Sequence, residues 1–120
     1  MEDRAEEASS VIVTLPAEID VINLSQVHAR LSAAVASGAP VIIADLTATS
    51  TCDAGAVRHL VMIREDAAAR GSQLRLVIPP GSLMRRMLVL FGVDHLLPVY
   101  PTIGKATDYA PAARQDPLSS

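Results

Sequence analysis

Aromatic side chains and an excess of positive charge are both lacking in this sequence of 120 residues. It contains no Trp, and its only aromatic residues are Phe91, Tyr100 and Tyr109. Proteins that hold single-stranded nucleic acids stack the bases on aromatic rings, and this chain offers few such platforms. Ten Lys and Arg residues against thirteen Asp and Glu residues give a formal charge of −3, so no broad basic field exists for phosphate backbones. We therefore expect no nucleic-acid partner.

Cysteine and long apolar runs are scarce as well. The single Cys52 cannot form an internal disulfide and leaves a zinc site short of thiolates, which suits a reducing cytosol. The acidic start M-E-D-R-A-E-E-A-S-S lacks the apolar segment of a signal peptide. No apolar run reaches the roughly 20 residues that a membrane span needs, and no His/Cys/Asp spacing matches a metal motif. These absences predict a cytoplasmic protein without membrane insertion, bound metal or cofactor.

Aliphatic residues are abundant, and their spacing predicts alternating strands and helices. Half of the residues are hydrophobic, so Val, Ile, Leu, Ala and Met supply the core. Continuous β-branched runs predict strands, and apolar residues three or four apart predict helices. The predicted strands are 11–15, 41–46, 74–78 and 95–100, and the predicted helices are 23–37, 54–71, 82–91 and 102–109. This order indicates an α/β domain over residues 11–109, with a flexible lead-in at 1–10 and a disordered tail at 110–120.

The junction T-S-T-C-D-A-G-A-V-R-H-L at 49–60 stands where a strand end meets a helix start, which is where α/β sheets gather function. Asp53 falls at the position of an N-cap, whose carboxylate accepts bonds from the first turn of the helix. That interpretation is favoured over a catalytic aspartate. The small residues Ala54, Gly55 and Ala56 carry no functional atoms, but they allow a partner or an anion to approach the backbone closely.

The other polar residues of the chain give weaker indications of chemistry. His59 could carry a phosphoryl group, but a position on a solvated helix face is the favoured interpretation. His28 and His95 lie in segments that the sequence does not connect. The loop hydroxyls of Thr49, Ser50 and Thr51 lack a nearby general base in the sequence, so loop hydrogen bonding is favoured for them. Cys52 is interpreted as a small hydrophobic residue. No enzyme activity is expected.

Four motifs, in the same order, resemble the STAS domain of bacterial anti-sigma factor antagonists. In that family, an early strand ends in L-x-G-E-L-D, a central hydrophobic strand ends in Asp-Leu, and the junction reads F-x-D-S-x-G-[LV]-x-x-L. A helix with an Arg pair then leads to the last strand. The matching segments are L-P-A-E-I-D at 15–20, V-I-I-A-D-L-T at 41–47, T-C-D-A-G-A-V-R-H-L at 51–60 and S-L-M-R-R-M-L-V-L-F-G-V-D-H-L-L-P-V-Y-P at 82–101. The resemblance implies a STAS-like single domain, a central mixed sheet of about four strands with alternating helices packed on it.

The resemblance also implies a function in transcription regulation by partner switching. In the family, a partner that is both anti-sigma factor and serine kinase phosphorylates the junction Ser, and the added charge ends binding. Here Ala54 or Gly55 stands at the Ser position, so the usual phosphoacceptor is missing, and Ser50 and Thr51 are the remaining weak candidates. We therefore expect an antagonist-like module that binds its partner constitutively, or one that is governed by expression, by a ligand or by a neighbouring hydroxyl such as that of Ser50 or Thr51. The expected partner surface comprises Asp20, Asp53, Ala54, Gly55, Ala56 and Arg58.

Three alternatives remain open from the sequence. The chain can be a STAS subunit of a membrane lipid or anion ABC transporter, or a domain that senses a small molecule in its aliphatic core. A phosphocarrier using His59 or a hydrolase using Asp53 is the least favoured. A homodimer is possible if the N-terminal strand forms a free sheet edge.

Overall fold

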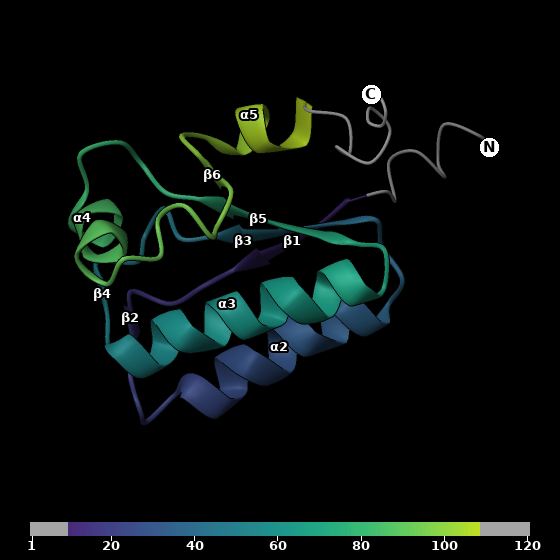
Figure 1. Ribbon diagram of the computed structural model, residues 1–120, viewed down its shortest axis with the longest axis horizontal. Coiled ribbons are helices and arrows are strands. Elements are labelled where there is room, and N and C mark those ends of the chain that lie inside the picture. The colour runs from purple at the N-terminus through teal and green to yellow at the C-terminus, as the bar shows by residue number, and fades with distance from the viewer. Residues whose placement is uncertain (1–9, 109–120) are drawn as a thin grey trace.

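A parallel sheet of four strands forms the middle layer of the molecule (Figure 1). The computed structural model describes residues 10–108. The order across the sheet is β1-β3-β5-β6, with β1 at Ser10–Thr14, β3 at Val41–Asp45, β5 at Gln73–Val77 and β6 at Val99–Tyr100. The expected α/β architecture is thus confirmed. Every pairing within this sheet is parallel, however, so the expectation of a mixed sheet was wrong.

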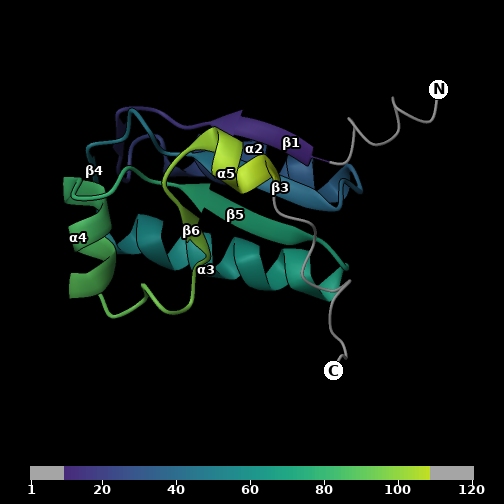
Figure 2. The same cartoon turned by 90° about the horizontal axis from the view of Figure 1, so that it is seen from above.

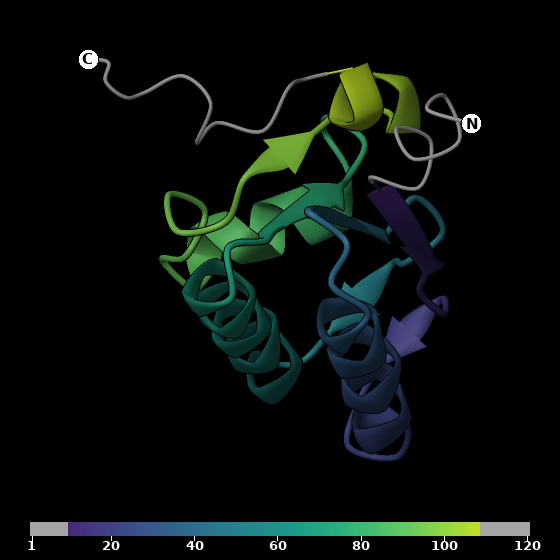
Figure 3. The ribbon, with the colours of Figure 1, turned by 90° about the vertical axis from the view of Figure 1, so that its right-hand side faces the viewer.

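Helices cover the two faces of the sheet unequally. The helices α2 (Leu24–Ala36) and α3 (Ala54–Ala69) lie side by side on one face, and the short α5 (Ile103–Asp108) lies on the other (Figures 1 and 3). Seen from above, α5 crosses over the sheet, and α4 (Leu83–Leu90) stands at one end of it (Figure 2). The connections between neighbouring strands of the sheet contain α2, α3 and α4 in turn. Because each connection returns the chain to the same edge of the sheet, the strands are parallel.

A second sheet of two very short strands was missed by the sequence analysis. The strands β2 (Glu18–Ile19) and β4 (Thr51–Cys52) pair in parallel, at the end of the main sheet where α4 also lies (Figure 1). Two residues are too few to show a period of two, so the sequence predicts neither strand. Their buried members, Ile19 and Cys52, are each no more than 3% exposed.

The main core lies between the sheet and the helices α2 and α3, and it is almost entirely aliphatic. A smaller apolar cluster lies under α5 and includes Ala106. Arg75 of β5 is also buried, at 2% exposed. The Arg75 Nη1 atom donates to the carbonyl oxygen of Ala106 at 2.6 Å, and its Nε and Nη2 atoms donate to Gln73 Oε1. The guanidinium also lies 5.5 Å from the centre of the Tyr100 ring. These contacts compensate the burial of a charge that would otherwise be costly.

Most predicted boundaries hold to within two residues, with two corrections. Ser10, assigned to the lead-in, is the first residue of β1. The strand expected at 95–100 is confined to Val99–Tyr100, because a turn with a bond from the Leu96 N–H to the Val93 carbonyl precedes it. The rest of the predicted lead-in and the predicted tail at 110–120 lie outside the described residues. Within residues 10–108, no helix has the length and apolarity that crossing a bilayer requires.

Candidate functional site

The predicted site is built on the β2–β4 pair at the end of the sheet. Ile19 and Cys52 are in register, and the Asp53 N–H donates to the Ile19 carbonyl oxygen at 3.3 Å. Asp20 and Asp53 each follow directly after this pair, so their backbones leave the small sheet as neighbours. The structure therefore brings together two segments that are about thirty residues apart in the sequence.

The predicted cap at the start of α3 is confirmed. Asp53 has extended backbone angles, φ −89° and ψ 176°, and its Oδ1 atom accepts a bond from the Ala56 N–H at 2.9 Å. Asp53 and Ala54 are exposed and Gly55 is half-buried. Ala56 is only 1% exposed and belongs to the core. Its side chain is not available to a partner, so its inclusion in the expected surface is corrected here.

Asp20 is also a capping residue, within the turn between β2 and α2. Its Oδ1 atom accepts bonds from the backbone N–H groups of Ile22 at 2.9 Å and Asn23 at 3.4 Å. The Asn23 side chain in turn accepts from the Asp20 N–H at 3.0 Å and donates to the Glu18 carbonyl oxygen at 2.7 Å. Asn23 thus stands at the N-cap position of α2, as predicted, but its side chain makes no capping bond there.

This tight turn displays two aliphatic residues that sequence reasoning missed. Val21 is 79% exposed and Ile22 is 86% exposed. Val21 and Ile22 directly follow Asp20 in the sequence and therefore border the predicted site. The available signal was two β-branched residues between an acidic loop residue and a helix cap, outside any strand or helix period. Adjacent exposed aliphatic side chains are a feature of contact surfaces.

The hydroxyl residues of the junction differ in accessibility. Thr49 is 4% exposed, and its Oγ1 atom donates to the Pro16 carbonyl oxygen at 2.7 Å. The Ser50 hydroxyl is exposed but bonds to the Ala17 carbonyl oxygen at 3.2 Å. The favoured interpretation as loop hydrogen bonding is therefore confirmed for both residues. Thr51 is exposed on β4, on the side opposite to the buried Cys52.

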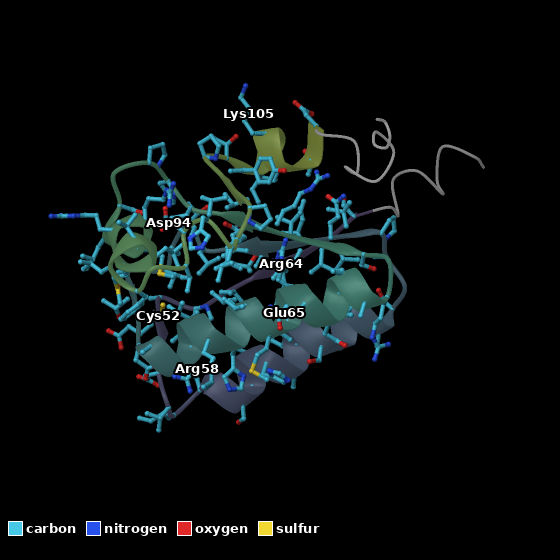
Figure 4. All side chains as sticks on the ribbon, in the orientation of Figure 1. Cys52, Arg58, Arg64, Glu65, Asp94 and Lys105 are labelled. Carbon is cyan, nitrogen blue, oxygen red and sulfur yellow. The ribbon has the colours of Figure 1, made fainter. Side chains whose placement is uncertain are left out.

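An open groove of about 270 Å³ adjoins the start of α3. It lies between α3 and the segment that leads from α4 to β6, and its lining is mostly apolar. Arg58 contributes the charged part of the lining and is exposed on α3 (Figure 4). The residues that line the groove are Ala54, Val57, Arg58, Val61, Phe91, Val93 and Leu96. The predicted surface thus continues into a shallow apolar depression.

Cys52 does not supply a nucleophile to this site. It is 3% exposed, and its Sγ atom lies 3.5 Å from the Sδ atom of Met84 in α4. Burial raises the pKa of the Cys52 thiol to about 11, and the negative charge of Asp53 adds to the effect. The thiol therefore stays protonated at neutral pH, in keeping with its interpretation as a small hydrophobic residue.

Two histidines that the sequence left unconnected meet between α2 and α3. The Nδ1 atoms of His28 and His59 are 3.0 Å apart, and the rings are nearly perpendicular, at 89°. Both side chains are half-buried, so the interpretation of His59 as part of a solvated helix face is corrected. His95 is exposed in another segment. Within residues 10–108, no group of three or more His, Cys, Asp or Glu side chains is arranged to hold a metal ion.

Comparisons with known proteins agree with this fold. The family model of the STAS domain matches residues 3–106. An anti-sigma factor antagonist from Mycobacterium paratuberculosis is 24% identical, with 82% of each chain covered and a TM-score of 0.72. A sulfate transporter family protein from Wolinella succinogenes is 21% identical, with 90% of this chain and 89% of that one covered and a TM-score of 0.70. No curated protein matches the sequence.

A third solved structure is the Bacillus cell fate determinant SpoIIAA in its phosphorylated form. It is 23% identical, with 84% of this chain and 90% of that one covered and a TM-score of 0.60. Identities this low show similarity of fold alone, and the fold is that of a parallel α/β domain. The family model covers most of the sequence. The chain therefore belongs to the STAS domain family.

Proposed function

We propose that this chain is an anti-sigma factor antagonist-like protein that regulates transcription by binding an anti-sigma factor of the serine-kinase class. It acts in the cytoplasm, by binding rather than by catalysis. The partner surface comprises Asp20, Asp53, Ala54, Gly55 and Arg58, as expected from the sequence without Ala56. The exposed Val21 and Ile22 extend it at one side.

The observation that carries this proposal is the pairing of β2 with β4. It joins the Asp20 turn to the start of α3 and leaves both accessible beside an open, mostly apolar groove. Exposed aliphatic residues supply contact area, while the carboxylates and Arg58 supply charges that select a partner. A surface with these components favours docking of another protein over binding of a small substrate.

The start of α3 lacks a hydroxyl on which the family switch can act. Ala54 is exposed and Gly55 half-buried, and neither carries an oxygen. Phosphate at this point would add a charge of about −1.5 to −2 beside the Asp53 carboxylate. Because the acceptor is absent, kinase activity of the partner cannot release this chain through residues 54 and 55. We therefore propose constitutive binding.

The first experiment measures affinity for the proposed partner class. Purified chain is titrated by calorimetry with each anti-sigma factor of the serine-kinase type encoded in the same genome. Arg58→Glu should weaken binding at least tenfold, because it inverts a charge in the contact surface. The matched control is Arg64→Glu, another exposed arginine about two turns further along α3 (Figure 4). Absence of measurable binding to every candidate would contradict the proposed function.

The second experiment restores the missing hydroxyl. Gly55→Ser is sterically permitted, because a Cβ atom there would meet only Asp53 Oδ1, at 3.5 Å. With partner and ATP, Ala54→Ser or Gly55→Ser should accept phosphate and then dissociate, while the unaltered chain stays bound. Phosphorylation of the unaltered chain at Ser50 or Thr51, followed by release, would show that constitutive binding is wrong while leaving the partner class intact.

The transporter alternative is supported by the similarity to the sulfate transporter family protein from Wolinella succinogenes. A transporter subunit would bind a permease and show no affinity for an anti-sigma factor. Co-purification with candidate permeases, compared with the calorimetric titrations above, separates the two functions. Binding of a permease that survives Arg58→Glu would favour the transporter function.

A further inference from the structure

The half-buried histidine pair between α2 and α3 is a cluster of potential metal ligands that the proposed function does not use. We propose that His28 and His59 form a binding site for a divalent first-row transition cation, with copper(II) bound more tightly than nickel(II) or zinc(II). Neither histidine lines the groove beside α3, and the proposed function assigns no role to either. The inference therefore does not depend on the proposed function.

The separation of the two ring nitrogens fits a pair of ligands on one cation. Imidazole nitrogens bind zinc at about 2.0–2.1 Å. With such bond lengths, two nitrogens are about 3.3 Å apart at a tetrahedral angle and about 2.9 Å apart at a right angle. The observed distance of 3.0 Å between His28 Nδ1 and His59 Nδ1 lies between these values. The separation itself needs to change by only about a few tenths of an ångström to match either angle.

The two helices hold the rings in place before any cation binds. Val27 precedes His28 in α2 and is 5% exposed, while Leu60 follows His59 in α3 and is 2% exposed. Because both neighbours are anchored in the main core, the backbones that carry the histidines are fixed relative to each other. α2 and α3 also run alongside each other over most of their lengths (Figure 3). Preorganised ligands of this kind lose little freedom on binding.

The change in proton positions is small. In the ion-free pair, one Nδ1 carries the proton of the shared hydrogen bond and the other accepts it. A cation needs the lone pairs of both Nδ1 atoms, so the donor ring transfers its proton to Nε2 through tautomerisation. The aqua cation loses two waters and keeps the rest. Imidazole ligands favour copper(II) over nickel(II) and zinc(II) in the order of intrinsic affinity, which sets the predicted preference.

The test is a titration of the full, untagged chain with copper(II) chloride, followed by calorimetry and electron paramagnetic resonance. We expect one equivalent to bind with nitrogen hyperfine coupling from two imidazoles. His28→Gln and His59→Gln should each weaken this binding tenfold or more, because loss of an outer partner alone typically costs 10–100-fold. His95→Gln is the matched control and should leave the affinity unchanged, since His95 lies in a separate exposed segment.

Two outcomes would contradict the proposed metal site at His28 and His59. One is copper binding of undiminished affinity in the His28→Gln/His59→Gln double variant, which would assign the ion to another group. The other is copper broadening of NMR ring signals that spares His28 and His59 in the unaltered chain. The NMR measurement uses no variant, so it remains decisive even if a substitution disturbs folding. Redox-inert zinc(II) should raise the melting temperature of the unaltered chain and not that of the double variant.

Discussion

The helices α3 and α5 begin with the same local device, yet only α3 begins at the proposed partner surface. Asp53 Oδ1 accepts the Ala56 N–H at 2.9 Å, and Thr102 Oγ1 accepts the Lys105 N–H at 3.1 Å. A glycine occupies the second helical position in each. The cap and the glycine are therefore general means of starting a helix, and they do not by themselves create a site.

The difference lies in what surrounds each helix start. Three residues beyond its cap, α3 places the buried Ala56, whereas α5 places the exposed Lys105, which points away from the sheet (Figure 4). The first turn of α3 therefore lies directly against the core. The β2–β4 pair adjoins this turn, and the bond from the Asp53 N–H to the Ile19 carbonyl oxygen links it to the Asp20 turn. The proposed partner surface thus depends on the burial of the first turn of α3 and on the β2–β4 pair, whereas α5 packs through Ala106 and leaves Lys105 exposed.

Truncating Ile19, in the strand β2 that pairs with β4 before the start of α3, should have the largest effect on stability. Ile19→Ala deletes a side chain that is 2% exposed, and such truncations cost about 2–5 kcal/mol of unfolding free energy. Ile103→Ala, in the first turn of α5, should cost less because Ile103 is only partly buried. Urea denaturation of both variants measures the difference. Equal losses would mean that the two helix starts are equally supported.

Cys52 should make the α3 junction sensitive to alkali. Its folded pKa of about 11 lies above the ordinary thiol pKa of 9.0, so the folded state retains the thiol proton where the unfolded state loses it. The resulting stabilisation is present below pH 9 and is lost as the pH rises from about 9 to 11, by about 2 kcal/mol. Cys52→Ala should show a correspondingly smaller decline in the same pH range. A pH dependence identical to that of the unaltered chain would contradict the buried thiol.

Removing the caps should give effects of intermediate size. Asp53→Ala should cost about 1–2 kcal/mol, since it removes a hydrogen bond and a negative charge at the positive end of a helix dipole. Thr102→Ala should cost about 1 kcal/mol or less, because Thr is a weaker cap and α5 is short. Thermal denaturation of both variants at neutral pH tests the order. A reversed order would argue that the α3 cap is compensated by other contacts.

The alternation of strands and helices could be predicted because most elements are long enough to show their periods. The runs at 41–46 and 74–78 are apolar except for Asp45 and Arg75, and the helical spacing from Leu24 to Val35 is regular. The β2–β4 pair could not be predicted, since two residues show no period and their pairing depends on distant parts of the chain. The buried Arg75 was also unforeseen, because its partner Ala106 contributes a backbone oxygen.

The candidate site was predicted in position but only partly in composition. Asp53 and Asp20 could be found from local motifs, because caps and turns depend on neighbouring residues. The burial of Ala56 depends on which side of α3 faces the core, and a short stretch of small residues does not reveal it. The contact between His28 and His59 depends on how α2 and α3 pack, so sequence spacing gave no signal for it.

The substitutions with the smallest expected effect on stability give the sharpest test of the difference between the starts of α3 and α5. Gly55→Ala and Gly104→Ala both place a methyl group at the second position of a capped helix, where the nearest atoms are Asp53 Oδ1 at 3.5 Å and Thr102 Oγ1 at 3.9 Å. Both changes should stabilise the fold by about 0.5–1 kcal/mol, because alanine loses less backbone freedom than glycine. Only Gly55→Ala should weaken partner affinity, since only α3 begins at the contact surface. Calorimetry of both variants checks this, and equal affinities would mean that the partner does not approach the backbone of the α3 start closely.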